Sequence, residues 1–383
     1  MIFGWGVFYI YGVFFTPLEQ EFHWTRAATS GAFSFSVLMS GVAGVIAGRL
    51  SDRLGPRVVI TFCAVLLAAG YCLMSIIHNL GQFYLVYGLL IATGVGGFWS
   101  PPVSTVARWF SGQRGLMTGI VSSGISFGTL LLPPLVTQLI SIYNWRATYL
   151  IIGGAVLVVV IVSARFLKSG PQSSQTKFVA GEKARLGAGR AGYTLKEAWR
   201  TRQFWLVAAV YLLFGFVQLT VMVHIVPAAT GMGFSAIRAA TVLSIIGGAS
   251  LVGRIIIGII SDKVRIKLAT VICLSLLTAA MILLQFAGSP GKMDAFAAVF
   301  GFGYGGLSCL QSLIAAELYG LTALGVITAI FSFSFNIGGA IGPVMAGYLF
   351  DVTQSYHWAF LLCLLAIIAA LLFFIPLKSP RRR

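Results

Sequence analysis

The chain has 383 residues, of which 58% are hydrophobic and only 9% are charged, and its formal net charge is +17. Its mean hydropathy of +0.94 lies far outside the soluble range, which excludes an ordinary soluble domain. A basic balance of this size can indicate a nucleic-acid partner, but these charges are distributed as in a membrane protein.

Apolar runs of spanning length, about 20 residues each, recur along the chain and predict an all-α membrane protein. The apolar start has no basic region before it and therefore does not resemble a cleavable signal peptide. The five cysteines fall within the runs without metal-ligand spacing, so we expect neither a metal site nor a disulfide. We predict twelve membrane-spanning helices, at 1–18, 27–50, 58–78, 83–109, 115–140, 147–167, 203–227, 239–260, 268–287, 294–318, 324–349 and 358–377.

The loops between these spans differ in charge. Assigning alternate loops to one side of the membrane collects 21 of the 26 lysines and arginines on that side. Only Arg26, Arg146, Arg238 and Lys292 fall on the other side, and Arg254 lies within a span. By the positive-inside rule, this asymmetry predicts a cytoplasmic (inner) membrane protein with both termini in the cytoplasm. The bilayer thus accounts for the charge, and we expect no nucleic-acid partner.

A polar, basic segment rich in Gly and Ser, 169–202, divides the spans into six and six. We interpret it as a cytoplasmic linker that carries a short surface helix around Thr194–Arg200. It separates an N-terminal six-helix bundle, 1–168, from a C-terminal six-helix bundle, 203–383. Four acids near span ends, Glu19, Glu21, Asp294 and Asp351, are interpreted as solvated.

The two halves repeat each other at an offset of 210 residues. This correspondence predicts parallel repeats, related by an axis along the membrane normal, with a site between them at mid-depth. Span seven begins near Gln203, whose partner position would fall eight residues before Met1, so we expect the first helix to lack its start. The matched pairs include Pro17 and Pro227, Gly96 and Gly306, Gly115 and Gly325, Gly128 and Gly338, and Pro133 and Pro343.

Arg254 lies deep within a predicted span, in the apolar run from Ala249 to Ile260. A guanidinium at that depth is costly unless it lines a protected cavity, which makes it a candidate for a functional site. Its planar fork of donors suits a carboxylate. The alternative is a structural arginine that is paired with backbone carbonyls. We expect Arg254 to bind the carboxylate of a small organic anion.

The loop between the second and third spans resembles the signature of the major facilitator superfamily. The segment from Gly48 to Arg57 fits the pattern G-x-x-x-D-R-x-G-x-[KR], and a weaker form starts at Gly258 in the equivalent loop of the second half. This resemblance implies the major facilitator fold, in which two six-helix bundles rock about a central site.

Other segments resemble the monocarboxylate porters and the bacterial oxalate–formate antiporters. These are the segment from Ala107 to Gly119, the aromatic-glycine triplet around Trp5, and the position of Arg254 on span eight. Two departures matter: the aspartate expected one turn before the arginine is Ser250, and span eleven lacks the lysine expected of oxalate antiporters. One cation suits one carboxylate better than two, which favours a lactate-like or pyruvate-like substrate over oxalate.

Five further residues are candidates for the substrate site. His224 can donate to an anion or carry a proton, although a neutral histidine bonded to a neighbouring helix is the alternative. Asn336 and Tyr304 offer hydrogen bonds at mid-membrane depth, and helix packing alone explains the glycines beside Tyr304. Tyr9 and Tyr11 point to different faces, so at most one lines the pathway, and we choose Tyr11. Phe333 is expected to form an apolar wall for the substrate.

Six charged residues are assigned to gating rather than to substrate. Asp52 can accept hydrogen bonds from a neighbouring helix end and from an arginine, which would close the cytoplasmic side in one state. Positive-inside topology explains the arginines but not an acid at this fixed spacing. The predicted gating residues are Asp52, Arg53, Arg57, Arg108, Arg114 and Asp262.

Together these features predict a secondary active transporter of small monocarboxylates that works with protons, as a monomer, by alternating access. An oxalate/formate-type anion antiporter is the alternative. A non-transporting receptor on the same fold would not need Arg254, and a channel would not need the 6+6 repeat. The sequence contains no Walker loop, no paired carboxylates and no histidine pair at metal spacing, so we expect no enzyme, cofactor or metal site.

Overall fold

The computed structural model describes residues 1–109, 114–166, 193–261, 264–320 and 322–377, and its regular elements within these ranges are all helices. Within these ranges, eleven helices are long and apolar enough to cross a membrane. The pair Ile2–Tyr9 and Tyr11–Phe22, bent by 49°, makes a twelfth when it is counted as one span. The predicted all-α fold with twelve spans is therefore confirmed. Helices dominate because in lipid each backbone polar group must find its partner within the protein.

The first half of the chain, residues 1–165, contains a bent first span and an interrupted fourth span. Thr25 caps α3 through a bond from the Ala28 N–H, and Asn144 caps α9 in the same way through Ala147. The elements are the π-helical η1 (Ile2–Gly6), α1 (Val7–Tyr9), α2 (Tyr11–Phe22), α3 (Arg26–Leu54), α4 (Pro56–Met74), α5 (Leu80–Phe83), the π-helical η2 (Tyr84–Ile91), α6 (Ala92–Gly96), α7 (Ser100–Trp109), α8 (Arg114–Tyr143) and α9 (Trp145–Arg165).

The second half, residues 193–377, begins with the predicted short surface helix. Thr194 caps it in a capping box: the Thr194 hydroxyl accepts from the Glu197 backbone N–H, and the Glu197 carboxylate accepts from the Thr194 backbone N–H. The elements are α11 (Leu195–Trp199), α12 (Arg202–Gly231), α13 (Ala236–Ser261), α14 (Ile266–Gln285), α15 (Pro290–Tyr319), α16 (Leu324–Thr353) and α17 (His357–Phe374).

The sequence repeat has a counterpart in packing. Gly128 of α8 lies so close to Gly6 that an added Cβ would meet the Gly6 Cα at 2.6 Å. Its repeat partner Gly338, on α16, packs against the backbone of α12 at Phe216, the repeat partner of Gly6. The same small residue thus lets the fifth span approach the first and the eleventh approach the seventh.

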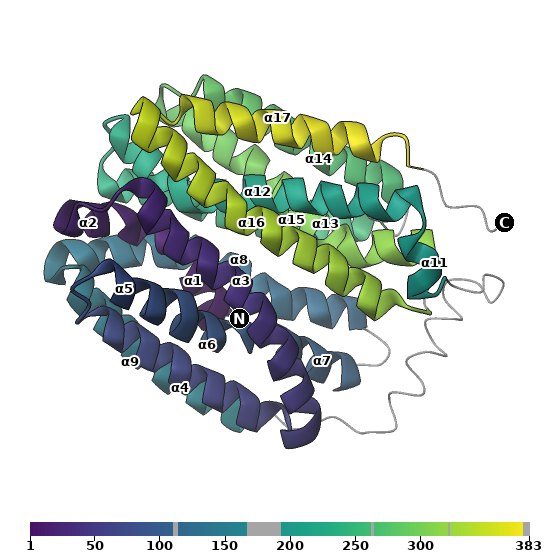
Figure 1. Ribbon diagram of the computed structural model, residues 1–383, viewed down its shortest axis with the longest axis horizontal. Coiled ribbons are helices and arrows are strands. Elements are labelled where there is room, and N and C mark those ends of the chain that lie inside the picture. Colours follow the sequence, from purple (N-terminus) through teal and green to yellow (C-terminus); the bar gives the residue numbers. More distant parts are fainter. Residues whose placement is uncertain (110–113, 167–192, 262–263, 321, 378–383) are drawn as a thin grey trace.

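The two halves meet along three helix pairs: α3 with α16, α8 with α13, and α2 with α12. Figure 1 shows the earlier helices in the lower part of the view and the later ones above them. We call the end that carries α11 the linker end, and the opposite end, with the turn between α16 and α17, the distal end (Figure 1).

Candidate functional site

Arg254 lies on α13 where this helix packs against α15. Its Nη2 lies 3.4 Å from the hydroxyl oxygen of Tyr304, to which it donates, and its guanidinium carbon lies 5.6 Å from the centre of the Tyr304 ring. The close approach depends on Gly253 and Gly305, since a Cβ at either glycine would collide with the backbone of the facing helix. The structure therefore brings the two predicted site residues Arg254 and Tyr304 together.

The guanidinium of Arg254 has spare hydrogen-bonding capacity. The side chain is half-buried, and its Nε is buried with no hydrogen-bond partner in the described part of the chain. The described ion pairs involve other arginines, not Arg254. A guanidinium in such surroundings favours an anion, because a buried donor without a partner and a charge without a counter-charge are both costly.

Ser250, which stands where the porters place an aspartate, takes part in the contact between the halves. Its Oγ lies 2.8 Å from Ser126 Oγ of α8 and 2.8 Å from the Gly247 carbonyl oxygen. It is fully buried. This hydroxyl pair supplies no charge, so it leaves the Arg254 charge without compensation.

The first span completes the site from the other half. Tyr9 is 8% exposed and lies near enough to Arg254 and Tyr304 for their charges and dipoles to act on its hydroxyl. Trp5, one turn earlier, has its ring 5.8 Å from that of Tyr9, and its buried Nε1 has no partner among the described residues. The span bends directly after Tyr9, at Ile10, as helices that line transport sites often do.

Tyr11, which the sequence favours over Tyr9, lies in the core of the first half rather than beside Arg254. It is 1% exposed, and its hydroxyl donates to the Thr29 carbonyl oxygen at 2.7 Å. Its ring stacks on Phe33 at 5.1 Å, within the aromatic core of the first half. The structure thus brings Tyr9, not Tyr11, to Arg254.

Asn336 and Phe333 lie on α16, apart from the Arg254–Tyr304 pair. Asn336 is half-buried at the contact with α3, where a Cβ added at Gly41 would lie 2.8 Å from its Nδ2. Phe333 is 55% exposed. Within the described residues, Asn336 forms no hydrogen bond with Arg254 or Tyr304, so its predicted contact with substrate remains a prediction, as does the Phe333 wall.

His224 is fully buried near the distal end, and both of its ring nitrogens are engaged. Nδ1 lies 3.0 Å from the Tyr356 hydroxyl, while Nε2 lies 2.9 Å from the Pro343 carbonyl oxygen and 3.1 Å from Ser30 Oγ. Because a carbonyl only accepts, the neutral ring carries its proton on Nε2. Within the described residues, His224 shares no hydrogen bond with Arg254 or Tyr304, so its predicted contact with substrate remains a prediction.

The distal end is closed by a second cluster that joins the halves. Asp351 of α16 accepts from the backbone N–H groups of Arg26 and Ala27 at 2.9 Å each, and so caps α3 across the interface. Arg26 also pairs with Glu19 at 2.8 Å, and its guanidinium carbon lies 3.5 Å above the Phe350 ring. We call Glu19, Arg26, Ser30, His224, Asp351 and Tyr356 the distal seal.

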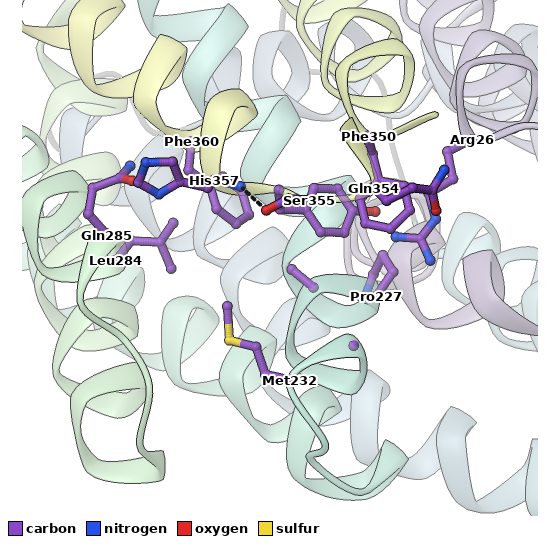
Figure 2. A pocket seen from close by; sticks show the side chains of 13 residues that line it. Arg26, Pro227, Met232, Leu284, Gln285, Phe350, Gln354, Ser355, His357 and Phe360 are labelled. Carbon is purple, nitrogen blue, oxygen red and sulfur yellow. Dashed lines mark hydrogen bonds between the residues drawn. The ribbon is translucent and has the colours of Figure 1, made fainter. Parts of the chain in front are cut away.

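A cavity of about 270 Å³ lies beside this seal. Figure 2 shows Arg26 and Phe350 at one side of it and Gln285 and His357 at the other, with Pro227 and Met232 below. Two carboxylates already flank Arg26, from Glu19 and Asp351, which makes the cavity a poor site for an anion.

The acids that we interpreted as solvated are in fact paired. Besides Glu19 and Asp351, Glu21 accepts from the Trp145 indole and from the Arg146 guanidinium, and Asp294 pairs with Arg238 at 2.5 Å. Each partner lies on a different helix from its acid, and in one case, Arg26 and Asp351, the two residues are 325 positions apart in the sequence.

The predicted gating residues that the structure describes lie at the linker end (Figure 1). Arg53 and Arg57 are exposed at the end of α3 and the start of α4. Asp52, Arg108 and Arg114 lie on helices, but their side chains are outside the described part, and Asp262 lies outside the described residues altogether. Their gating role therefore remains a prediction.

A helical bundle of membrane-spanning length, with a half-buried arginine that has no acidic partner among the described residues, is the architecture expected of a membrane transporter of anions. The family model described as Major Facilitator Superfamily matches residues 1–343, and the chain belongs to this superfamily. The predicted resemblance is thereby confirmed.

Several relatives cover most of the chain. Monocarboxylate transporter 12 of Rattus norvegicus is 28% identical over 93% of this chain and 78% of its own length. Monocarboxylate transporter 13 of the same organism is 27% identical over 93% and 81%. The uncharacterized MFS-type transporter YhjX of Escherichia coli (strain K12) is 29% identical over 80% and 76%.

Among solved structures, a bacterial homologue of the human lysosomal transporter Spinster, inward-facing and unoccupied, superposes with a TM-score of 0.72. It is 14% identical, and the match covers 97% of this chain and 93% of that one. At this identity the likeness shows the fold alone.

Proposed function

We propose that the protein is a secondary active transporter of small monocarboxylates of the size of lactate or pyruvate. The observation that carries this proposal is Arg254, a half-buried guanidinium with a free buried Nε and no acidic partner among the described residues. The two relatives named monocarboxylate transporters support the choice of substrate class.

In this proposal the substrate carboxylate binds to Arg254 through charge-assisted hydrogen bonds. The hydroxyl of Tyr304, which already accepts from Arg254, and that of Tyr9 orient the carboxylate. The indole N–H of Trp5 is a free donor for a keto or hydroxyl oxygen. Asn336 and Phe333 belong to the moving helix α16 and would complete the polar and apolar walls.

Transport proceeds by alternating access in this proposal, with the linker end in the cytoplasm. The hydrogen bonds that join the two halves lie at the distal seal and at the Ser126–Ser250 pair within the described part. Substrate would therefore reach Arg254 from the linker end in this conformation. The charged residues around Asp52 would close that end when the distal seal opens.

Proton coupling is part of the proposal, by one of two routes. A proton can travel on the substrate as the undissociated acid, or it can bind His224 when the distal seal opens and exposes the ring. In the closed seal described above, both ring nitrogens are occupied, so protonation would follow opening rather than cause it.

The test is uptake of labelled lactate by proteoliposomes under an inward proton gradient. We expect accumulation by the wild type, and loss of at least about a hundredfold in Arg254→Gln, because a desolvated carboxylate would lose its counter-charge. Arg202→Gln, which removes an exposed arginine from the start of α12, is the matched control and should transport normally. Exchange of oxalate for formate without lactate uptake would support the antiporter instead.

A further inference from the structure

A groove of about 570 Å³ runs along the outer surface of the first half, between α4 and α9. Its walls are apolar and open to the bilayer, with Phe62 62% exposed and Val65 45% exposed. Arg57 and Arg165 line the same groove at the linker end, where α4 begins and α9 ends. The groove therefore combines a hydrocarbon-facing trough with two cations at the depth of lipid headgroups.

The two guanidinium groups are available to a ligand. Both residues are exposed, and neither forms a hydrogen bond or ion pair with another residue in the described ranges. The first turn of α4 starts with Pro56 and has no side-chain cap at Gly55, so backbone N–H groups beside Arg57 are also free of side-chain acceptors. Free N–H groups at a helix start favour an anion, and guanidinium groups favour a phosphate.

We propose that this groove binds an anionic phospholipid of the leaflet at the linker end. The headgroup phosphate lies between Arg57 and Arg165 at the start of α4. One acyl chain follows the trough past Thr61 and Phe62 to Val65. A zwitterionic lipid binds less well, since its own ammonium group offsets the phosphate that the two arginines neutralise.

The experiment is native mass spectrometry of the whole protein released from nanodiscs that contain equal amounts of phosphatidylglycerol and phosphatidylcholine. We expect the wild type to retain phosphatidylglycerol about tenfold more than phosphatidylcholine. The variant Arg57→Gln/Arg165→Gln should retain the two lipids equally. Lys196→Gln/Arg200→Gln removes two exposed charges near the same end but outside the groove, and it should behave as the wild type.

A groove variant that keeps the wild-type preference would overturn the proposal. An equal loss in the control would do so too, because it would assign the preference to general surface charge. A second measurement uses the unaltered protein and a photoactivatable phosphatidylglycerol. Cross-links within 57–65 or 161–165 are expected, and cross-links confined to other segments would refute the site.

Discussion

Two properties suit the Arg254 side chain to a carboxylate: its positive charge and its planar fork of donors. Lysine keeps the charge but replaces the planar fork with a single ammonium group, which cannot bind a carboxylate in bidentate fashion. We therefore expect Arg254→Lys to retain some lactate uptake but to raise the KM by about tenfold or more. Initial rates in proteoliposomes measure this, with thermal unfolding as a control for folding. A KM equal to that of the wild type would mean that Arg254 does not contact the substrate.

Substitution by phenylalanine removes only the hydroxyl from a tyrosine, so Tyr9→Phe and Tyr11→Phe form a matched pair of variants. Tyr9→Phe removes a hydroxyl near Arg254, and we expect a KM increase of roughly threefold to tenfold with little change in stability. Tyr11→Phe removes the bond to the Thr29 carbonyl oxygen, and we expect normal transport with stability lower by about 1 kcal/mol. Uptake kinetics and thermal unfolding of both variants test this assignment, which the reverse pattern would contradict.

The sequence predicts that Arg254 and Tyr304 both belong to the substrate site, and the structure places their side chains within hydrogen-bonding distance. It favours Tyr11 over Tyr9, whereas the structure places Tyr9 near Arg254 and Tyr11 in the aromatic core of the first half. The bend at Ile10 separates the faces of α1 and α2, and a regular helical period does not contain that bend. The hydrogen-bond partners of His224 were equally hard to predict, because one of them, Ser30, lies 194 residues away across the interface. Contacts between the halves leave no local pattern in the sequence.

At the scale of elements, the distal seal depends on one helix end capping another. Asp351 holds the start of α3 with two hydrogen bonds, and its charge also faces the positive end of that helix dipole. Asp351→Asn keeps one acceptor and removes the charge, which should weaken the closed distal end by about 1–2 kcal/mol. The open-distal population should then rise about tenfold.

Labelling of a buried cysteine measures this shift. The reporter is the substitution Val223→Cys, introduced into a variant from which the native cysteines have been removed. Val223 is fully buried on α12, where α2 packs against this helix. A membrane-impermeant maleimide should react about tenfold faster when Asp351→Asn is added. Asp294→Asn is the control, since its partner Arg238 lies in the same half and its loss should leave the rate unchanged. Equal acceleration in both variants would indicate general loosening rather than an opened seal.

The element boundaries were largely predictable, because the length of an apolar run and the caps at its ends are local features. The repeat also carried over to packing, as Gly128 and Gly338 occupy equivalent contacts. The role of the four span-end acids was not predictable. Each partner belongs to a different helix end, and only the assembled bundle brings these ends together.

At the scale of the whole molecule, alternating access requires the two ends to open in opposite senses. If the two halves move as rigid groups, as the proposed mechanism requires, a rotation that separates them at the distal seal must bring them together at the linker end. Two pairs of spin labels can follow this motion. Arg53→Cys with Val326→Cys reports the linker end, and His78→Cys with Ser235→Cys reports the distal end, since all four residues are exposed.

We expect Asp351→Asn to lengthen the distal distance and to shorten the linker-end distance in the same sample, as measured by double electron–electron resonance. The physical reason is that the substitution weakens only contacts of the closed-distal state, so it shifts the population toward the opposite state. Lengthening at both ends would indicate a bundle that expands, and a change confined to the distal end would indicate local fraying of α3. Only the reciprocal change has the form of a rocking motion about the Arg254 site.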